Sequence, residues 1–267
     1  RVMDFSTKHF KHDIFYNNGV SGASLEDYIS IYQCYKERDI LPKKLIIEIT
    51  PWIFNKNNNQ IRWKTLRPYY NRYKNIDYNI INDAEIFAMK YCPLLSLSYF
   101  QSSLPKLIFG KETPSPRKLI NDNYSKLTML ADGSVKYPNE YSNADQKVVN
   151  NKILDYVNQK EGLYSLNGFN TLSKELFSDF NNFIDECKSK NICLEFYLIP
   201  YPPLVFDKIE QDYLMVLETE KAIKEIADKN DIKYIGTYDP FKLNIDESYF
   251  VDGMHLNLKG ISIILKQ

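Results

Sequence analysis

Short apolar runs rich in β-branched residues alternate along the chain with longer stretches of helical periodicity. The runs cover residues 45–50 (LIIEIT), 193–200 (CLEFYLIP) and 232–240 (IKYIGTYDP), and a proline ends or follows each of them. Short, nearly continuous apolar runs of this kind are typical of parallel strands that are buried on both faces. We therefore expect three parallel strands.

Helical patterns stand before these runs, at residues 24–39, 171–191 and 212–230. The expected N-caps are Ser24, with Asp27 at the third helical position, and either Thr171 or Ser173. The apolar positions that define the three patterns are Leu25, Ile29, Tyr32 and Tyr35, then Leu172, Leu176, Phe180, Phe183 and Ile184, then Leu214, Leu217, Ile223 and Ile226. Helices that alternate with strands predict a parallel sheet covered on both faces.

Between about residues 56 and 165 the periodic pattern is lost. The beginning of this block is polar and aromatic, and the later segments 111–118 and 131–143 are turn-rich. Some helix is expected within residues 79–104. We interpret the block as an insertion or cap on a single α/β domain that spans residues 1–267. Its aromatic residues Trp63, Tyr69 and Tyr70 either shape a sugar-binding groove or pack in the core or on the surface.

Charge and cysteine content narrow the classes of function. Lys and Arg total 34, as do Asp and Glu, so the net charge gives no case for binding nucleic acid or an anionic membrane. No run reaches the ~18 apolar residues that can span a bilayer, and no signal peptide opens the chain. The first residue is Arg1, so the sequence is expected to be a piece of a longer protein. The four cysteines, none spaced as a metal site, are read as small core residues: Cys34, Cys92, Cys187 and Cys193.

Two short segments contain candidate chemistry. Residues 17–24 (NNGVSGAS) form a glycine-rich turn ahead of a helix, in which Gly19 and Gly22 allow positive φ and the free backbone N–H groups can hold an oxyanion. A tight strand-to-helix turn without catalytic function is the alternative.

The second segment is Asp252–Gly253–Met254–His255, where an acid three residues before a histidine can orient a general base. Alternatively, Asp252 caps the next helix and His255 is an ordinary surface residue. His9 and His12 lie in a Lys-rich loop and are expected to be ordinary surface residues. Because the carboxyl ends of parallel strands form ligand sites, residues 17–24, 50–55 and the Asp252–His255 turn are expected to converge there.

Taken in order, VSGASLEDY, LIIEITPWIFN and FVDGMHL resemble blocks of the SGNH (GDSL-type) hydrolase superfamily. They are most similar to its bacterial cell-envelope branch, which includes the D-alanine transfer protein and alginate acetylation proteins. About half of the chain carries the resemblance, and the middle block matches only loosely, through RWKTL and DGS. The resemblance implies a three-layer α/β/α sandwich with a mainly parallel, flavodoxin-like sheet.

The resemblance also assigns roles to residues. It makes Asp252 and His255 the acid and base of a triad and gives the Gly22 N–H to the oxyanion hole. The block that normally supplies an asparagine to the oxyanion reads TPWIFN here, so Thr50 or Asn55 is a substitute without a residue-for-residue match. The nucleophilic serine and the first strand are expected just upstream of Arg1, and Ser6 has no strand leading into it.

The implied function is that of an esterase or O-acyltransferase acting on an acylated carbohydrate or similar polymer of the cell envelope. The implied location is the periplasmic or extracytoplasmic side, with membrane association through segments outside this sequence. No metal or organic cofactor is expected. The alternative is an SGNH-like binding or scaffold protein that has lost its chemistry.

Overall fold

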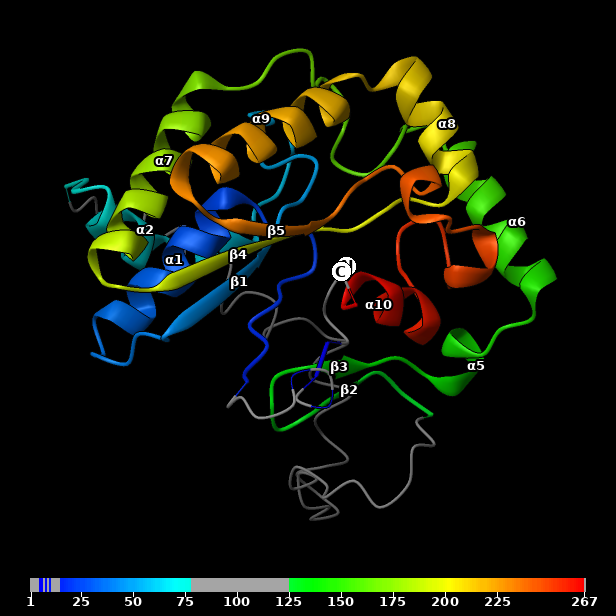
Figure 1. Cartoon of the computed structure of the whole chain (residues 1–267), viewed down its shortest axis with the longest axis horizontal. Helices are drawn as coiled ribbons and strands as arrows, with labels where there is room; N and C mark the ends of the chain where they lie inside the picture. Colours follow the sequence, from blue (N-terminus) through cyan, green and yellow to red (C-terminus); the bar gives the residue numbers. More distant parts are fainter. Residues whose placement is uncertain (1–4, 7, 9, 11–14, 78–124, 267) are drawn as a thin grey trace, which may run out of the picture.

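The computed structural model describes residues 5–6, 8, 10, 15–77 and 125–266, with a three-stranded parallel sheet at its centre (Figure 1). Strand β1 (Lys44–Glu48) pairs with β4 (Cys193–Leu198), which pairs with β5 (Lys233–Gly236). The three expected strands are thus present and parallel. Each ends a few residues before its proline, which has no N–H for the ladder and restricts the residue before it.

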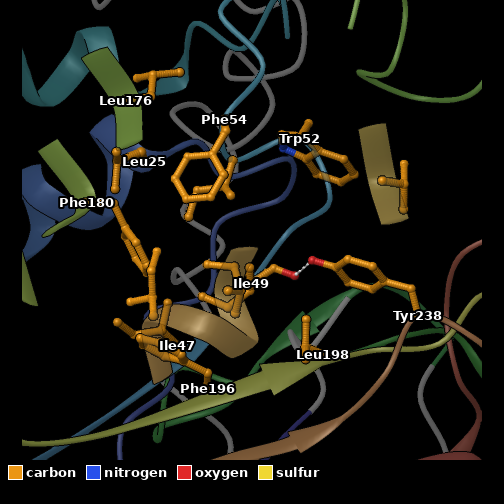
Figure 2. Close-up of a cluster of buried hydrophobic side chains, with 14 of the residues drawn as sticks. Leu25, Ile47, Ile49, Trp52, Phe54, Leu176, Phe180, Phe196, Leu198 and Tyr238 are labelled. Carbon is orange, nitrogen blue, oxygen red and sulfur yellow. Dashed lines mark hydrogen bonds between the residues drawn. The ribbon is translucent and has the colours of Figure 1, made fainter. Parts of the chain in front are cut away.

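The three expected helices pack on one face of the sheet. These helices, α1 (Leu25–Lys36), α7 (Lys174–Ser189) and α9 (Met215–Asn230), share one apolar core with side chains of β1 and β4 (Figures 1 and 2). The Tyr238 hydroxyl, beyond β5, donates to the Ile49 carbonyl at 2.8 Å and ties the two edges of the sheet together. The largest fully buried side chains in this core include Trp52, Phe54, Phe180, Phe183 and Phe196.

The helix caps follow the sequence closely. The Ser24 N–H donates to the Asp27 carboxylate and the Ser24 side chain accepts from the Asp27 N–H, which together form the expected capping box. The Ser24 hydroxyl also donates to the same carboxylate. Of the two candidates for α7, Ser173 is the cap, and its hydroxyl accepts from the Leu176 N–H.

The opposite face of the sheet has a second, smaller core. Tyr197, Ile199 and Ile235 pack there against the short helix α10 (Leu258–Ile264), and Phe5 lies edge-on to Tyr197. The predicted α/β class with a parallel sheet is therefore confirmed. Among the described residues, one short helix covers this face, which is less than the full helical layer of a three-layer sandwich.

Outside the block at 56–165, the pattern missed the helix between β4 and α9. Residues Pro203–Asp212 form α8, which ends just before α9, so the expected helix at 212–230 begins later than predicted. Leu214, assigned to the apolar face, is exposed because it lies at the junction of α8 and α9.

Part of the block at 56–165 is packed into the domain. Val149 and Ile153 of α6 lie in the main core. The turn-rich segment 131–143 contains a strand and a one-turn helix besides its turn, whereas the helix expected within 79–104 lies outside the described residues. The described elements of the block are η2 (Arg62–Leu66), α2 (Arg67–Tyr73), the hairpin of β2 (Thr128–Met129) and β3 (Val135–Lys136), α5 (Asn139–Ser142) and α6 (Gln146–Val157).

The aromatic residues that follow β1 pack against one another and against arginines. The Trp63 and Tyr70 rings lie 5.1 Å apart, and the Arg72 guanidinium lies 4.7 Å from the Tyr69 ring. Of the two interpretations, the structure therefore places these residues in packing contacts.

The cysteines are only partly core residues. Cys187 is buried, Cys34 is half-buried and Cys193 is exposed, while Cys92 lies outside the described residues. The prediction of a buried Cys193 is wrong because this residue opens β4 at the amino edge of the sheet, where its side chain meets solvent.

Candidate functional site

The turn before α10 brings Asp252 and His255 together. The Asp252 carboxylate oxygens lie 2.9 and 3.0 Å from His255 Nδ1, so the expected carboxylate–imidazole contact is present. The two side chains are 20% and 30% exposed, respectively, and remain accessible. When Nδ1–H is donated to Asp252, the free lone pair lies on Nε2, as in a histidine that acts as a general base.

Further donors fix the Asp252 carboxylate. The N–H groups of Met254 and His255 donate to Oδ1 at 2.7 and 2.8 Å, and the Tyr141 hydroxyl donates to Oδ2. Burial by itself would raise the pKa of Asp252, but hydrogen bonding and charge from His255, with help from Tyr141, hold it well below 3.8. Burial and the Asp252 charge together raise the pKa of the Tyr141 phenol. Asp252 is therefore ionised at neutral pH.

The turn has a defined local structure. Phe250 and Leu256 form an antiparallel bridge, and the Val251 N–H donates to the His255 carbonyl at 2.9 Å. Asn257 caps α10 through its side-chain oxygen, which accepts from the Lys259 and Gly260 N–H groups. The alternative role of Asp252 as the cap of this helix is thus excluded.

Tyr141 and Tyr137 were not identified from the sequence. Tyr137 lies 5.2 Å from the Tyr141 ring and 6.1 Å from the His255 ring, by centroids. Both come from the block at 56–165, and Tyr141 precedes Asp252 by 111 residues. No local pattern signals a contact over that separation.

The glycine-rich turn adopts the geometry that its glycine allows. The Ala23 N–H donates to the Val20 carbonyl at 3.1 Å, and Gly22 has a φ of 66° at the third position of this turn. A side chain at Gly22 would collide with the Tyr164 hydroxyl, Gln60 and Arg62. Gly19, which also allows positive φ, is not among the described residues with a left-handed backbone. Within the described part of the chain, the Gly22 N–H has no acceptor.

Asn55 lies in the loop after β1 and is buried. Its side-chain Nδ2 donates to the Ser165 carbonyl at 2.8 Å, and its Oδ1 accepts from the Asn57 N–H at 2.9 Å. The amide thus holds this loop against residues 163–166, with one N–H of the NH₂ group left for any other acceptor. Thr50, the other candidate, is buried where β1 leaves the sheet.

Two sets of contacts connect the glycine-rich turn to the Asp252–His255 turn. The Tyr164 side chain reaches Gly22, and the backbone N–H of Tyr164 donates to the Tyr156 hydroxyl at 3.0 Å. The Tyr156 ring in turn lies against Gly253. In addition, the β2–β3 hairpin contacts the glycine-rich segment, where the Asn17 N–H donates to the Asp132 carbonyl at 2.7 Å. The same hairpin leads directly to Tyr137 beside His255.

The third segment joins them at the carboxyl edge of the sheet. The Trp52 indole N–H donates to the Ala23 carbonyl at 2.9 Å, which fixes residues 50–55 to the glycine-rich turn. The three segments that the sequence places at this edge are thus connected by contacts. Ser6 is buried, and His9 and His12 lie outside the described residues.

None of the family models, curated proteins and solved structures compared with the chain matches it. Among the described residues, no group of three or more His, Cys, Asp and Glu side chains is arranged to bind a metal ion. No helix in the described ranges has the length and apolar character needed to cross a membrane.

Proposed function

We propose that Asp252 and His255 are the acid and base of a serine-type acyl-transfer site. The protein is then an SGNH-like esterase or O-acyltransferase that acts on an ester-linked acyl group of a cell-envelope glycan or similar polymer. The observation that supports this function most strongly is the 2.9 Å contact between His255 Nδ1 and an ionised, firmly anchored Asp252. This contact orients the ring and stabilises the imidazolium that forms when Nε2 takes a proton.

The proposed reaction has two steps. A serine attacks the acyl carbonyl while His255 Nε2 accepts its hydroxyl proton, and the Gly22 N–H donates to the developing oxyanion. The tetrahedral intermediate expels the carrier alcohol, which takes the proton back from His255. Water or a sugar hydroxyl then attacks the acyl-enzyme by the same route and releases the serine.

The three-layer α/β/α arrangement belongs to the same proposal. Apolar cores on both faces of the sheet support it, one with α1, α7 and α9 and the other with α10 and Phe5. The block at 56–165 is then an insertion that delivers Tyr137 and Tyr141 to the site. The cell-envelope location rests on the sequence resemblance.

Ester hydrolysis by the full-length protein tests the function. A general base contributes ~10²–10⁴-fold, so His255→Ala should lower the rate on p-nitrophenyl acetate by at least about 100-fold. Lys259→Ala, an exposed change four residues away on α10, is the matched control and should keep the wild-type rate. Equal rates for wild type and His255→Ala would contradict the assignment and favour a binding or scaffold protein.

A further inference from the structure

A cavity of about 710 Å³ lies beside the Gly22 turn. One wall is the loop after β1, residues 57–65, and the other is formed by residues 159–167, which precede α7. We call this space the amide cavity. Its volume is within the ~300–1,000 Å³ typical of small-molecule sites.

Carboxamide side chains dominate the lining. A carboxamide carries both donors and an acceptor, which is the pattern that neighbouring hydroxyl groups require. Several of these amides also bond to other groups of the cavity walls. The formally charged side chains of the lining are Arg62 and Glu161, whose charges cancel. A polyanion would need an excess of cations, which this lining does not have. The amides are Asn57, Asn58, Asn59, Gln60, Gln159 and Asn167.

The walls of the amide cavity are fixed to each other. The Gln60 amide donates to the Ser165 hydroxyl at 2.5 Å, and the Asn57 amide donates to the Gly168 carbonyl at 3.2 Å. Asn59 and Ser165 have left-handed backbones, with φ of 57° and 59°. A polar site that is held in shape before binding loses less entropy when a ligand enters.

Tyr164 adds an aromatic surface. Its side chain is exposed, and its ring is held edge-on by Trp52 at 5.4 Å between centroids. An anchored, partly exposed ring offers an apolar face with a polar tip, which suits the C–H face of a sugar. The Tyr164 hydroxyl also lies against Gly22, so this end of the cavity meets the proposed oxyanion donor.

We infer that the amide cavity is a subsite for a neutral, hydroxyl-rich carbohydrate chain that carries the acyl group. The role of this chain as acyl carrier rests on the proposed function, whereas its binding does not require His255. Trp63, Tyr69 and Tyr70, the aromatic residues that the sequence suggests for a sugar groove, are not among the lining residues.

Calorimetric titration of the full-length protein tests the inference. The probes are neutral di- to hexasaccharides of glucose, mannose and N-acetylglucosamine, with polygalacturonate and polyglycerol phosphate as anionic counterparts. At least one neutral series should bind, and its affinity should fall at least tenfold in both Tyr164→Ala and Gln159→Ala. Lys160→Ala, an exposed neighbour outside the lining, should bind as wild type does.

Two further results are expected. Affinity for the neutral chain should stay within about twofold when salt rises from ~0.05 to ~0.5 M, because no net charge is involved. His255→Ala should bind the oligosaccharide as tightly as wild type does. Thermal unfolding of each variant verifies that it is folded, and Gln159→Ala changes only an exposed side chain.

Three results would overturn the inference: no neutral oligosaccharide binds, binding persists in both cavity variants, or an anionic polymer is preferred with strong salt dependence. Failure of the inference is distinguishable from failure of the proposed function. Ester hydrolysis that needs His255, without oligosaccharide binding, removes the inference alone. Oligosaccharide binding that needs Tyr164, without hydrolysis, removes the proposed catalysis alone.

Discussion

Asp252 is a partly buried carboxylate whose neighbours keep it ionised. Its pKa in the folded protein lies below the usual value of 3.8, mainly because contacts with His255 and Tyr141 outweigh burial. The unfolded chain therefore binds more protons than the folded protein does between the two pKa values. The lowered pKa of Asp252 therefore stabilises the folded protein. This stabilisation is fully present above about pH 4 and is lost as the pH falls through the pKa of Asp252 in the folded protein.

Replacing Asp252 should consequently have a pH-dependent effect. Asp252→Asn should lower the free energy of unfolding by about 1–3 kcal/mol at pH 7, because it removes an acceptor for several partly buried donors. The difference from wild type should shrink below about pH 4, where the wild-type carboxylate begins to lose its advantage. Urea unfolding of wild type and Asp252→Asn from pH 7 to below pH 4 measures this difference in the free energy of unfolding. Asp155→Asn, an exposed change, is the control. A difference that does not change with pH would contradict the role given to the charge.

The Tyr141 hydroxyl should position the Asp252 carboxylate, which in turn orients the His255 ring. Tyr141→Phe removes the hydroxyl donor but keeps the ring that stacks on Tyr137. Such a hydrogen bond to a charged group contributes ~1.5 kcal/mol or more, so kcat/KM for ester hydrolysis should fall about tenfold. Tyr35→Phe, which loses a hydroxyl bonded to Asn18 on the surface, should not change it. Unchanged hydrolysis in Tyr141→Phe would mean that Asp252 needs no third partner.

The sequence predicted the Asp252–His255 contact and the positive φ that glycine allows at position 22, since both depend on residues within one turn. It did not predict Tyr137 and Tyr141. Their contacts join segments more than 100 residues apart, and tyrosine is so frequent in this chain, with 21 residues, that neither position stands out.

At the scale of elements, α10 and its cap hold the Asp252–His255 turn in place. Asn257 caps the helix, and it also closes the turn because its side-chain N–H donates to the Ser248 carbonyl at 2.7 Å. Asn257→Ala should therefore lower the free energy of unfolding by about 1–2 kcal/mol. Urea denaturation measures the change, and Lys259→Ala on the same helix should have no effect beyond about 0.5 kcal/mol. Equal stability of the two variants would exclude the capping role.

The three strands of the parallel sheet and helices α1, α7 and α9 were predictable because burial imposes a period on their residues. Helix α8 was not, since the prolines at 200, 202 and 203 signal the end of β4. Proline is equally suited to the first turn of a helix, and α8 begins at Pro203. The same residue type thus ends one element and begins the next.

At the scale of the molecule, contacts connect segments from four parts of the chain near the carboxyl edge of the parallel sheet. Ligand sites of parallel sheets lie at the carboxyl ends of the strands, and this rule predicted from the sequence that residues 17–24, 50–55 and 252–255 lie at this edge. The contribution of the block at 56–165 was beyond prediction, because its residues Tyr141, Tyr156 and Tyr164 reach the edge through long-range packing without a periodic signal.

The central claim is that the Asp252–His255 pair activates a serine of this protein. Labelling of the full-length protein with a fluorophosphonate, followed by mass spectrometry of the labelled peptide, measures this directly because the reagent reacts with activated serines. We predict one labelled serine, with labelling at least about 100-fold slower in His255→Ala and unchanged in Lys259→Ala. Equal labelling of wild type and His255→Ala, or no labelled serine in either, would contradict the claim.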